Sequence, residues 1–89
     1  MITTRQIKAA RLYLGWEQRD LAEKSGLSLP TIQRMEKLGM GKSSVANAEK
    51  VVKALQDAGI IFIEAGAYSG EGGEGVRLAS GRNYIETGE

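Results

Sequence analysis

Apolar residues recur at intervals of three and four near the start of the chain, which is the spacing of an amphipathic helix. This stretch covers roughly residues 4 to 14. Its apolar face consists of Ile7, Ala10 and Leu14. Thr3 or Thr4 can cap the helix start, and Gln6 is placed for a capping box with Thr3. The pattern therefore predicts an N-terminal helix.

A second helix is predicted to open at Glu17 and to run to about Lys24, with acidic residues in its first turn that suit the helix dipole. Its inward side carries Leu21 and the small residue Ala22. The next three residues, 25–27, have glycine at their centre and form a tight corner. The chain then turns directly into another helical segment.

Ser28 is a good N-cap for a third helix that runs to about Leu38. Pro30 is tolerated in its first turn because the N–H that proline lacks has no helical partner there. Ile32 and Met35 define the inward side of this helix. A short helix, a tight corner and a second helix at this spacing form a helix-turn-helix, which places its second helix in a DNA groove.

A connecting loop over residues 39–43 leads to a fourth helix, which Ser44 can cap and which ends at Gly59 as C-cap. Its predicted apolar stripe consists of Val45, Ala48, Val51, Val52 and Leu55.

After the fourth helix the pattern changes from helical to extended. Residues 60–63 are β-branched or aromatic and too few for a helix, and residues 76–78 offer a second strand across a Gly-rich loop. The two strands suggest an antiparallel hairpin. Alternation places Ile60 and Phe62 on one face and Ile61 and Ile63 on the other, so a hairpin lying on the helices leaves one apolar face uncovered. A second subunit can cover it, which makes the strand Ile60, Ile61, Phe62, Ile63 the candidate dimer interface.

These patterns divide the chain into a helix-turn-helix region over residues 1–58, a hairpin over 59–79 and a polar tail over 80–89. The tail is polar apart from Tyr84 and Ile85, which leaves two alternatives, disorder or docking on a partner. A chain of 89 residues buries about 60 to 65% of its unfolded surface, enough for one modest core.

Charge is distributed unevenly along the chain. The net charge is +1, but residues 1–56 hold ten Lys/Arg and five Asp/Glu, whereas residues 57–89 hold two and six. The basic part therefore coincides with the helix-turn-helix, as expected for a protein that binds nucleic acid.

The residue types present exclude several classes of chemistry. The chain has no cysteine and no histidine, which removes disulfides, thiol nucleophiles, imidazole bases and the common zinc sites. Residues 70–75 match the G-x-G-x-x-G pattern of dinucleotide sites, but no helix can follow them and their two carboxylates would repel a pyrophosphate. We assign no catalytic residue, no cofactor and no metal site. Without a membrane span or a signal peptide, a cytoplasmic location is expected.

The outward side of the third helix carries Pro30, Gln33, Arg34 and Lys37, and the last three of these are candidate DNA contacts. Arg34 can bind guanine O6 and N7, and Gln33 can pair with adenine N6 and N7. Ser28 and Thr31 are short donors suited to a phosphate or a nearby base, and Lys37 can reach the DNA backbone. Alternatively, this side is only a solvated helix face.

The motif resembles the Cro and phage-repressor family of helix-turn-helix proteins over about residues 5 to 58. The matching positions are Gln18, Leu21, Ala22, Gly26, Leu27, Ser28, Ile32 and Glu36. The resemblance implies a mainly α, four-helix, lambda-repressor-like DNA-binding domain, here followed by a two-stranded β-hairpin. Beyond residue 58, the segments 59–62 and 75–78 resemble a bacterial subgroup of the family with a C-terminal hairpin.

The resemblance also implies roles for Gln18, Arg11 and Glu36. Gln18 would contact a phosphate and brace the reading helix, and Arg11 would form an internal ion pair with Glu36, which makes Arg11 an element of the fold. Trp16 is interpreted as core or hinge packing rather than as a base-stacking residue.

The sequence departs from the family at Leu29 and Pro30, where members that read DNA often carry polar residues. Leu29 can touch a thymine methyl group, or this surface can meet protein instead. After the motif, Lys42, Ser43 and Ser44 lie at the start of the fourth helix, where free N–H groups and the helix dipole attract phosphate.

The expected function is sequence-specific binding of double-stranded DNA by a homodimer that regulates transcription, acting as a repressor. Two alternatives remain open. One is an antitoxin-like autoregulator whose acidic C-terminal part binds a toxin, and the other is a protein-interaction module on the same fold that does not read DNA.

Overall fold

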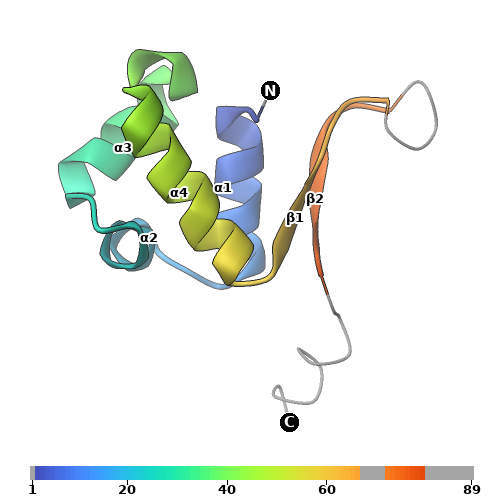
Figure 1. Cartoon of the computed structure of the whole chain (residues 1–89), viewed down its shortest axis with the longest axis horizontal. Coiled ribbons are helices and arrows are strands. Elements are labelled where there is room, and N and C mark those ends of the chain that lie inside the picture. The colour runs from blue at the N-terminus through green and yellow to red at the C-terminus, as the bar shows by residue number, and fades with distance from the viewer. Residues whose placement is uncertain (1, 67–71, 80–89) are drawn as a thin grey trace, which may run out of the picture.

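The structure is a computed structural model that describes residues 2–66 and 72–79. Its elements are α1 (Thr4–Tyr13), α2 (Gln18–Ser25), α3 (Leu29–Leu38), the 3-10 turn η1 (Met40–Lys42), α4 (Val45–Asp57), β1 (Ile60–Ile63) and β2 (Gly75–Leu78). The four helices pack together, and the hairpin stands at one side of them (Figure 1). The predicted fold class, a mainly helical domain with a C-terminal two-stranded hairpin, is confirmed. The predicted tail, with Tyr84 and Ile85, lies outside the described residues.

Local capping explains where the helices begin. The Thr3 hydroxyl accepts from the Gln6 backbone N–H at 3.2 Å and the Gln6 side chain accepts from the Thr3 backbone N–H at 2.9 Å, which completes the predicted capping box. The hydroxyls of Ser28 and Ser44 each accept a hydrogen bond from the backbone three residues further on. Each cap satisfies a backbone donor that has no partner within its helix.

The core lies where the helices face one another and extends to the first residue of β1. Its buried apolar residues are Ile7, Ala10, Leu21, Ala22, Ile32, Met35, Val51, Ala54, Leu55 and Ile60. Trp16 is half-buried and packs against this cluster, in agreement with its predicted packing role. No helix within residues 2–66 or 72–79 is long and apolar enough to cross a membrane.

Two details of α4 differ from the sequence prediction. Val45 was expected in the apolar stripe but is 74% exposed, because at 100° per residue it lies about 120° around the helix from the buried Val51. Ala54, which the predicted stripe omitted, is buried instead. The helix ends at Asp57 with Ala58 as C-cap, and Gly59 follows with φ +104°, a conformation that favours glycine.

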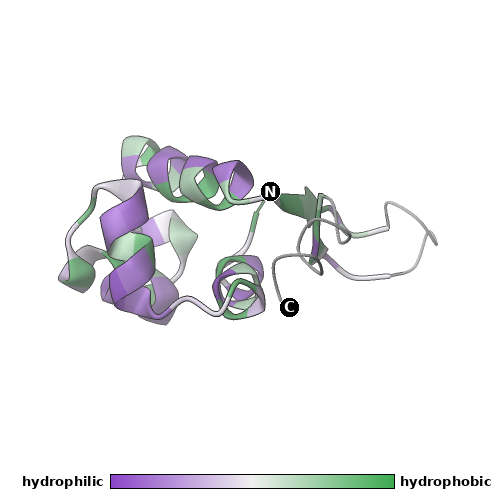
Figure 2. Ribbon diagram, turned by 90° about the horizontal axis from the view of Figure 1, so that it is seen from below, coloured by the Kyte–Doolittle hydropathy of each residue, from purple (hydrophilic) through white to green (hydrophobic). Residues whose placement is uncertain are grey.

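The hairpin has one face toward the helices and one face away from them. Its strands are antiparallel, with the cross-strand pairs Ile60–Leu78, Ile61–Arg77, Phe62–Val76 and Ile63–Gly75. Ile60 is 3% exposed, and Phe62, Val76 and Leu78 pack against the core. The other face therefore carries Ile61 and Ile63 beside Arg77. In Figure 2 the hairpin lies to one side of the helices, and the mainly hydrophobic colouring of its strand is visible.

Candidate nucleic-acid interface

The second helix of the motif, α3, has one buried side and one exposed side. Ile32 and Met35 are 0% and 1% exposed and fix the helix against the core. The predicted outward residues Pro30, Gln33, Arg34 and Lys37 are all exposed. Leu29 is 38% exposed at the start of the helix. The polar side of α3 therefore faces solvent.

A buried ion pair holds α3 against α1. Arg11 Nε donates to Glu36 Oε2 at 2.8 Å, and Arg11 Nη2 donates to Glu36 Oε1 at 3.0 Å. A third donor of the guanidinium, Nη1, bonds the backbone oxygen of Trp16 at 3.0 Å. Glu36 is only 4% exposed, so its charge needs these partners. The ion pair that the resemblance implied is present, and it joins the last turn of α3 to the last turn of α1.

Gln18 adds a third contact to the same carboxylate. Its side-chain Nε2 donates to Glu36 Oε1 at 2.9 Å, so the start of α2 is tied to α3. A side-chain amide carries two N–H donors, which leaves one beyond the bond to Glu36. Gln18 is half-buried at this point. The geometry accounts for its bracing role and is compatible with a phosphate contact.

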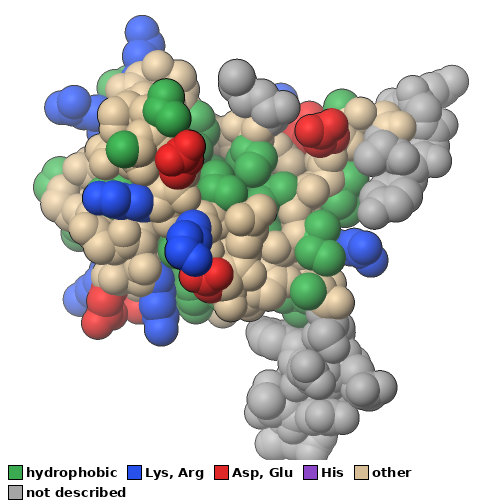
Figure 3. Space-filling view, viewed as in Figure 1, with side chains coloured by type: hydrophobic (Ala, Val, Ile, Leu, Met, Phe, Trp, Pro, Cys, Tyr) green, Lys and Arg blue, Asp and Glu red, His purple; other side chains and the backbone are tan. Residues whose placement is uncertain are grey.

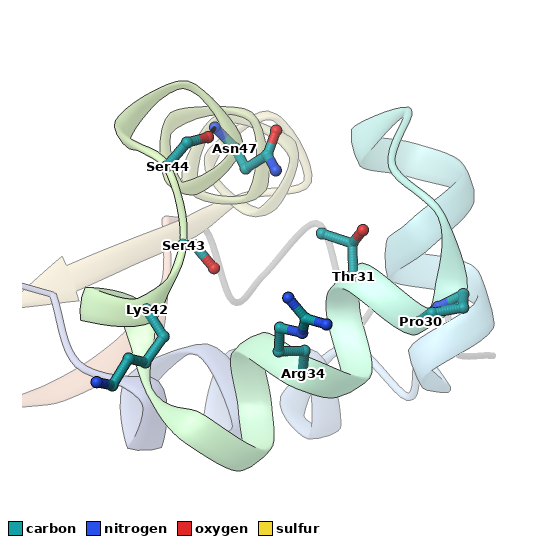
Figure 4. Close-up of a pocket in the computed structure, with 7 residues that line it drawn as sticks. All are labelled: Pro30, Thr31, Arg34, Lys42, Ser43, Ser44 and Asn47. Carbon is teal, nitrogen blue, oxygen red and sulfur yellow. Dashed lines mark hydrogen bonds between the residues drawn. The ribbon is translucent and has the colours of Figure 1, made fainter.

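A hollow of about 320 Å³ lies between α3 and the start of α4. It is lined by Pro30, Thr31, Arg34, Lys42, Ser43, Ser44 and Asn47. Figure 4 shows Arg34 and Thr31 extending from α3 toward the segment that carries Lys42 and Ser43. The structure thus brings five of the predicted site residues together, although they lie in two separate stretches of sequence.

Asn47 is a lining residue that the sequence interpretation missed. It lies three residues after the cap residue Ser44, whose hydroxyl accepts its backbone N–H. The available signal was a polar residue in the first turn of a helix that follows a basic loop. Its amide adds both donor and acceptor capacity beside the phosphate-binding candidates.

The hydroxyls of Ser28 and Thr31 are partly engaged by the fold. They lie 2.9 Å apart and share one hydrogen bond, and the Ser28 oxygen also caps α3. Because each hydroxyl has one proton, only one of the two retains a donor for a ligand. The pair can therefore offer a ligand one donor rather than the two that the sequence suggested.

The cations around this surface have no acidic partner in the part of the chain that the structure describes. The ion pairs there are Arg5–Glu74, Arg11–Glu36, Arg19–Glu17 and Lys53–Asp57. Arg34, Lys37 and Lys42 belong to none of them, and all three are exposed. Their charge is available to an anionic ligand.

The family comparison agrees with this geometry, because residues 7–56 match the helix-turn-helix family of the Cro and C1 type. The chain belongs to this family. It is accordingly a DNA-binding transcriptional regulator of the helix-turn-helix type, with α3 in the place of the recognition helix. No curated protein and no solved structure gave a significant match.

The hairpin lies outside the matched region of this helix-turn-helix protein. Of the four residues predicted for a dimer interface, Ile60 is buried against the helices and Phe62 packs on the core. Only Ile61 and Ile63 lie on the face turned away from the helices.

A second hollow, mainly apolar, runs along the outer side of α4. It is lined by Ile2, Met40, Gly41, Ser43, Val45, Ala48, Glu49, Val52, Lys53 and Gln56. Apolar side chains also gather near the middle of the face shown in Figure 3. With one acidic and one basic side chain, this hollow does not suit a phosphate backbone.

Proposed function

We propose that this helix-turn-helix protein is a sequence-specific repressor that binds an operator as a dimer through the DNA major groove. The observation that best supports this proposal is the position of Arg34 and Lys42 on opposite sides of the hollow between α3 and α4. Both are exposed cations, and neither has an acidic partner among residues 2–66 and 72–79. A base-reading helix beside a phosphate-binding loop is the arrangement that such recognition needs.

Base reading is assigned to the exposed side of α3. Arg34 reads guanine through O6 and N7, and Gln33 reads adenine through N6 and N7. Leu29, at 38% exposure, contacts a thymine methyl group. Lys37, in the last turn, binds the DNA backbone.

Phosphate binding is assigned to the loop and helix start beside α3 and to Gln18. Lys42 supplies charge, and Ser43 and Ser44 supply short donors at the N-terminus of the thirteen-residue α4. These contacts fix the register of the protein on DNA without selecting a sequence. Thr31 or Ser28 contributes the single hydroxyl donor that their mutual hydrogen bond leaves.

Dimerisation is assigned to the outer face of the hairpin, where Ile61 and Ile63 lie beside Arg77. One module of this size covers about 600–1,000 Å² on DNA, so two half-sites are the usual route to useful affinity. A two-fold dimer would place its recognition helices in successive major grooves about 34 Å apart. Bound in the cytoplasm to its operator, the dimer represses by excluding polymerase.

The proposal is tested by selecting binding sites from a randomised duplex pool with the wild-type protein and with Arg34→Ala. We expect a two-fold symmetric motif for the wild type, and for the variant a loss of preference at one position per half-site of about 5- to 100-fold. Lys53→Ala, which changes an exposed cation on another side of α4, serves as the control and should keep the full motif. Absence of any motif, or a variant motif identical to the wild type, contradicts the assignment.

The apolar hollow along α4 favours a second candidate, binding of a protein partner such as a toxin. Salt dependence separates the two functions. DNA binding through several Lys and Arg weakens steeply between low and moderate salt, whereas an apolar protein contact does not.

A further inference from the structure

The buried side-chain amide of Gln6 joins α1 to the hairpin, and its nitrogen donates two hydrogen bonds to the strands. It is 3% exposed, and its Nε2 donates to the backbone oxygen of Ile63 at 3.0 Å and to that of Gly75 at 2.9 Å. Its Oε1 accepts from the Thr3 backbone N–H at 2.9 Å. Ile63 and Gly75 are cross-strand partners, so one side chain holds both strands at the same level.

The two ends of the hairpin are held by different chemistry. At the end nearest α4, the 3% exposed Ile60 is part of the core, and the Ala79 N–H bonds the Gly59 oxygen at 2.6 Å. At the other end, Gln6 makes the buried contact. The additional ion pair there, Arg5 to Glu74 at 3.3 Å, has an arginine side chain that is 86% exposed and therefore contributes little. Phe62 and Val76, the neighbouring cross-strand pair, pack against the core, and Gln6 adds the buried polar contact that fixes the Ile63–Gly75 pair to α1.

Helix α1 is also the element that holds the recognition helix. Gln6 binds the hairpin from its first turn, and Arg11 binds Glu36 of α3 from its last turn. Two polar contacts on one ten-residue helix thus connect the hairpin to α3. A rotation of the hairpin relative to α1 changes the direction in which Ile61 and Ile63 point relative to the recognition helix.

From this connection we infer that Gln6 is a positioning residue that sets the spacing between the two half-sites of the operator. The inference rests on the proposed function, in which the hairpin joins the subunits and α3 reads DNA. One base pair changes the separation of half-sites by about 3.4 Å and their relative rotation by about 35°. A dimer therefore selects one spacing only when its hairpins are fixed relative to its recognition helices.

Gln6→Met tests this role because it keeps the length of the side chain and removes both donors to the hairpin, together with the acceptor of the Thr3 N–H in the capping box. The probe is a set of duplexes carrying the selected half-sites with spacers that differ in steps of one base pair. We expect the wild type to prefer one spacer over its neighbours by about tenfold or more, and the variant to prefer it by less than about threefold, since losing the two hydrogen bonds to the hairpin amounts to roughly a tenfold factor. The half-site sequence should stay the same.

Gln56→Met is the control for the same substitution, because Gln56 is exposed on α4 and its side chain forms no hydrogen bond to the described part of the hairpin. It should keep the wild-type spacer preference. Gln6→Asn provides a milder variant, because it keeps the amide and shortens the side chain by one methylene, which moves the donors away from the oxygens of Ile63 and Gly75. We expect it to broaden the preference by about twofold, even if Gln6→Met does not fold.

The outcomes separate this inference from the proposed function. If the wild-type protein selects single half-sites or no site, the proposal of a dimeric repressor is wrong, and the role inferred for Gln6 is wrong as well. Paired half-sites with an unchanged spacer preference in Gln6→Met, or in Gln6→Asn when Gln6→Met does not fold, overturn the role of Gln6 and leave the repressor intact.

Discussion

Arg11 and Arg34 are arginines in the same helical domain, yet their surroundings are opposite. The Arg11 side chain is 13% exposed and donates to Glu36 and to the backbone of Trp16. Arg34 is exposed, and within residues 2–66 and 72–79 it forms no ion pair. Arg11 uses its charge inside the fold, whereas the charge of Arg34 is left for a ligand.

The comparison shows that residue type alone does not distinguish a structural cation from a binding one. An arginine that neutralises a buried carboxylate stabilises the fold because removing it leaves that charge unpaired. An exposed arginine without a partner contributes little to folding, so substituting it should affect binding alone. Substituting a cation that pairs with a buried carboxylate should therefore lower stability, and substituting an exposed, unpaired cation should lower DNA affinity.

The largest decrease in the free energy of unfolding is expected for Arg11→Met. This change leaves Glu36 buried without its two arginine hydrogen bonds, and we expect the free energy of unfolding to fall by about 3–5 kcal/mol. Urea titration followed by circular dichroism measures it. Arg34→Met is the matched control and should shift stability by no more than about 0.5 kcal/mol. Similar losses of unfolding free energy in the two variants would contradict the distinction between a structural and a binding arginine.

A smaller decrease in the free energy of unfolding is expected for Gln18→Leu. It removes one of three side-chain hydrogen bonds to the Glu36 carboxylate while both from Arg11 remain, so we expect a loss of about 1.5 kcal/mol. The same urea titration measures this change. Combining it with Arg11→Met should give a non-additive loss, because both side chains bind the same carboxylate. Additive losses would mean that the two contacts act independently.

The smallest effect on the free energy of unfolding is expected for Lys42→Ala. Like Arg34, Lys42 is exposed and is proposed to act in DNA binding rather than in folding. Stability should change by no more than about 0.5 kcal/mol, whereas DNA affinity should fall by a similar factor for all sequences. The slope of log affinity against log salt should decrease by about 0.9 because one phosphate contact is lost. A sequence-dependent loss with an unchanged slope would assign Lys42 to base reading instead.

Local signals explain why so much of the fold could be predicted. Helix starts follow from short-range hydrogen bonds at Thr3, Ser28 and Ser44, and each cap is present. The apolar period identified the inward residues of α3. Val45 was misplaced because it lies about 120° around α4 from Val51, away from the buried side of the helix.

Contacts between distant segments could not be obtained in the same way. The hollow that unites Arg34 with Lys42 and Asn47 depends on how α3 packs against the start of α4. The capping role of the Gln6 side chain could be predicted from its neighbours. Its hydrogen bonds to the backbone oxygens of Ile63 and Gly75 could not, because these residues are 57 and 69 positions further along the chain. No local pattern encodes such a pair.

The sequence by itself determined the helix-turn-helix, the hairpin and the family, because these depend on spacing, capping and periodicity within short stretches. Only the tertiary structure decided which polar residues form hydrogen bonds and ion pairs inside the molecule and which stay exposed to solvent. It also decided which face of β1 is covered, with Ile60 inside and Ile61 outside. The physical reason is that burial and pairing are properties of surroundings that distant segments supply together.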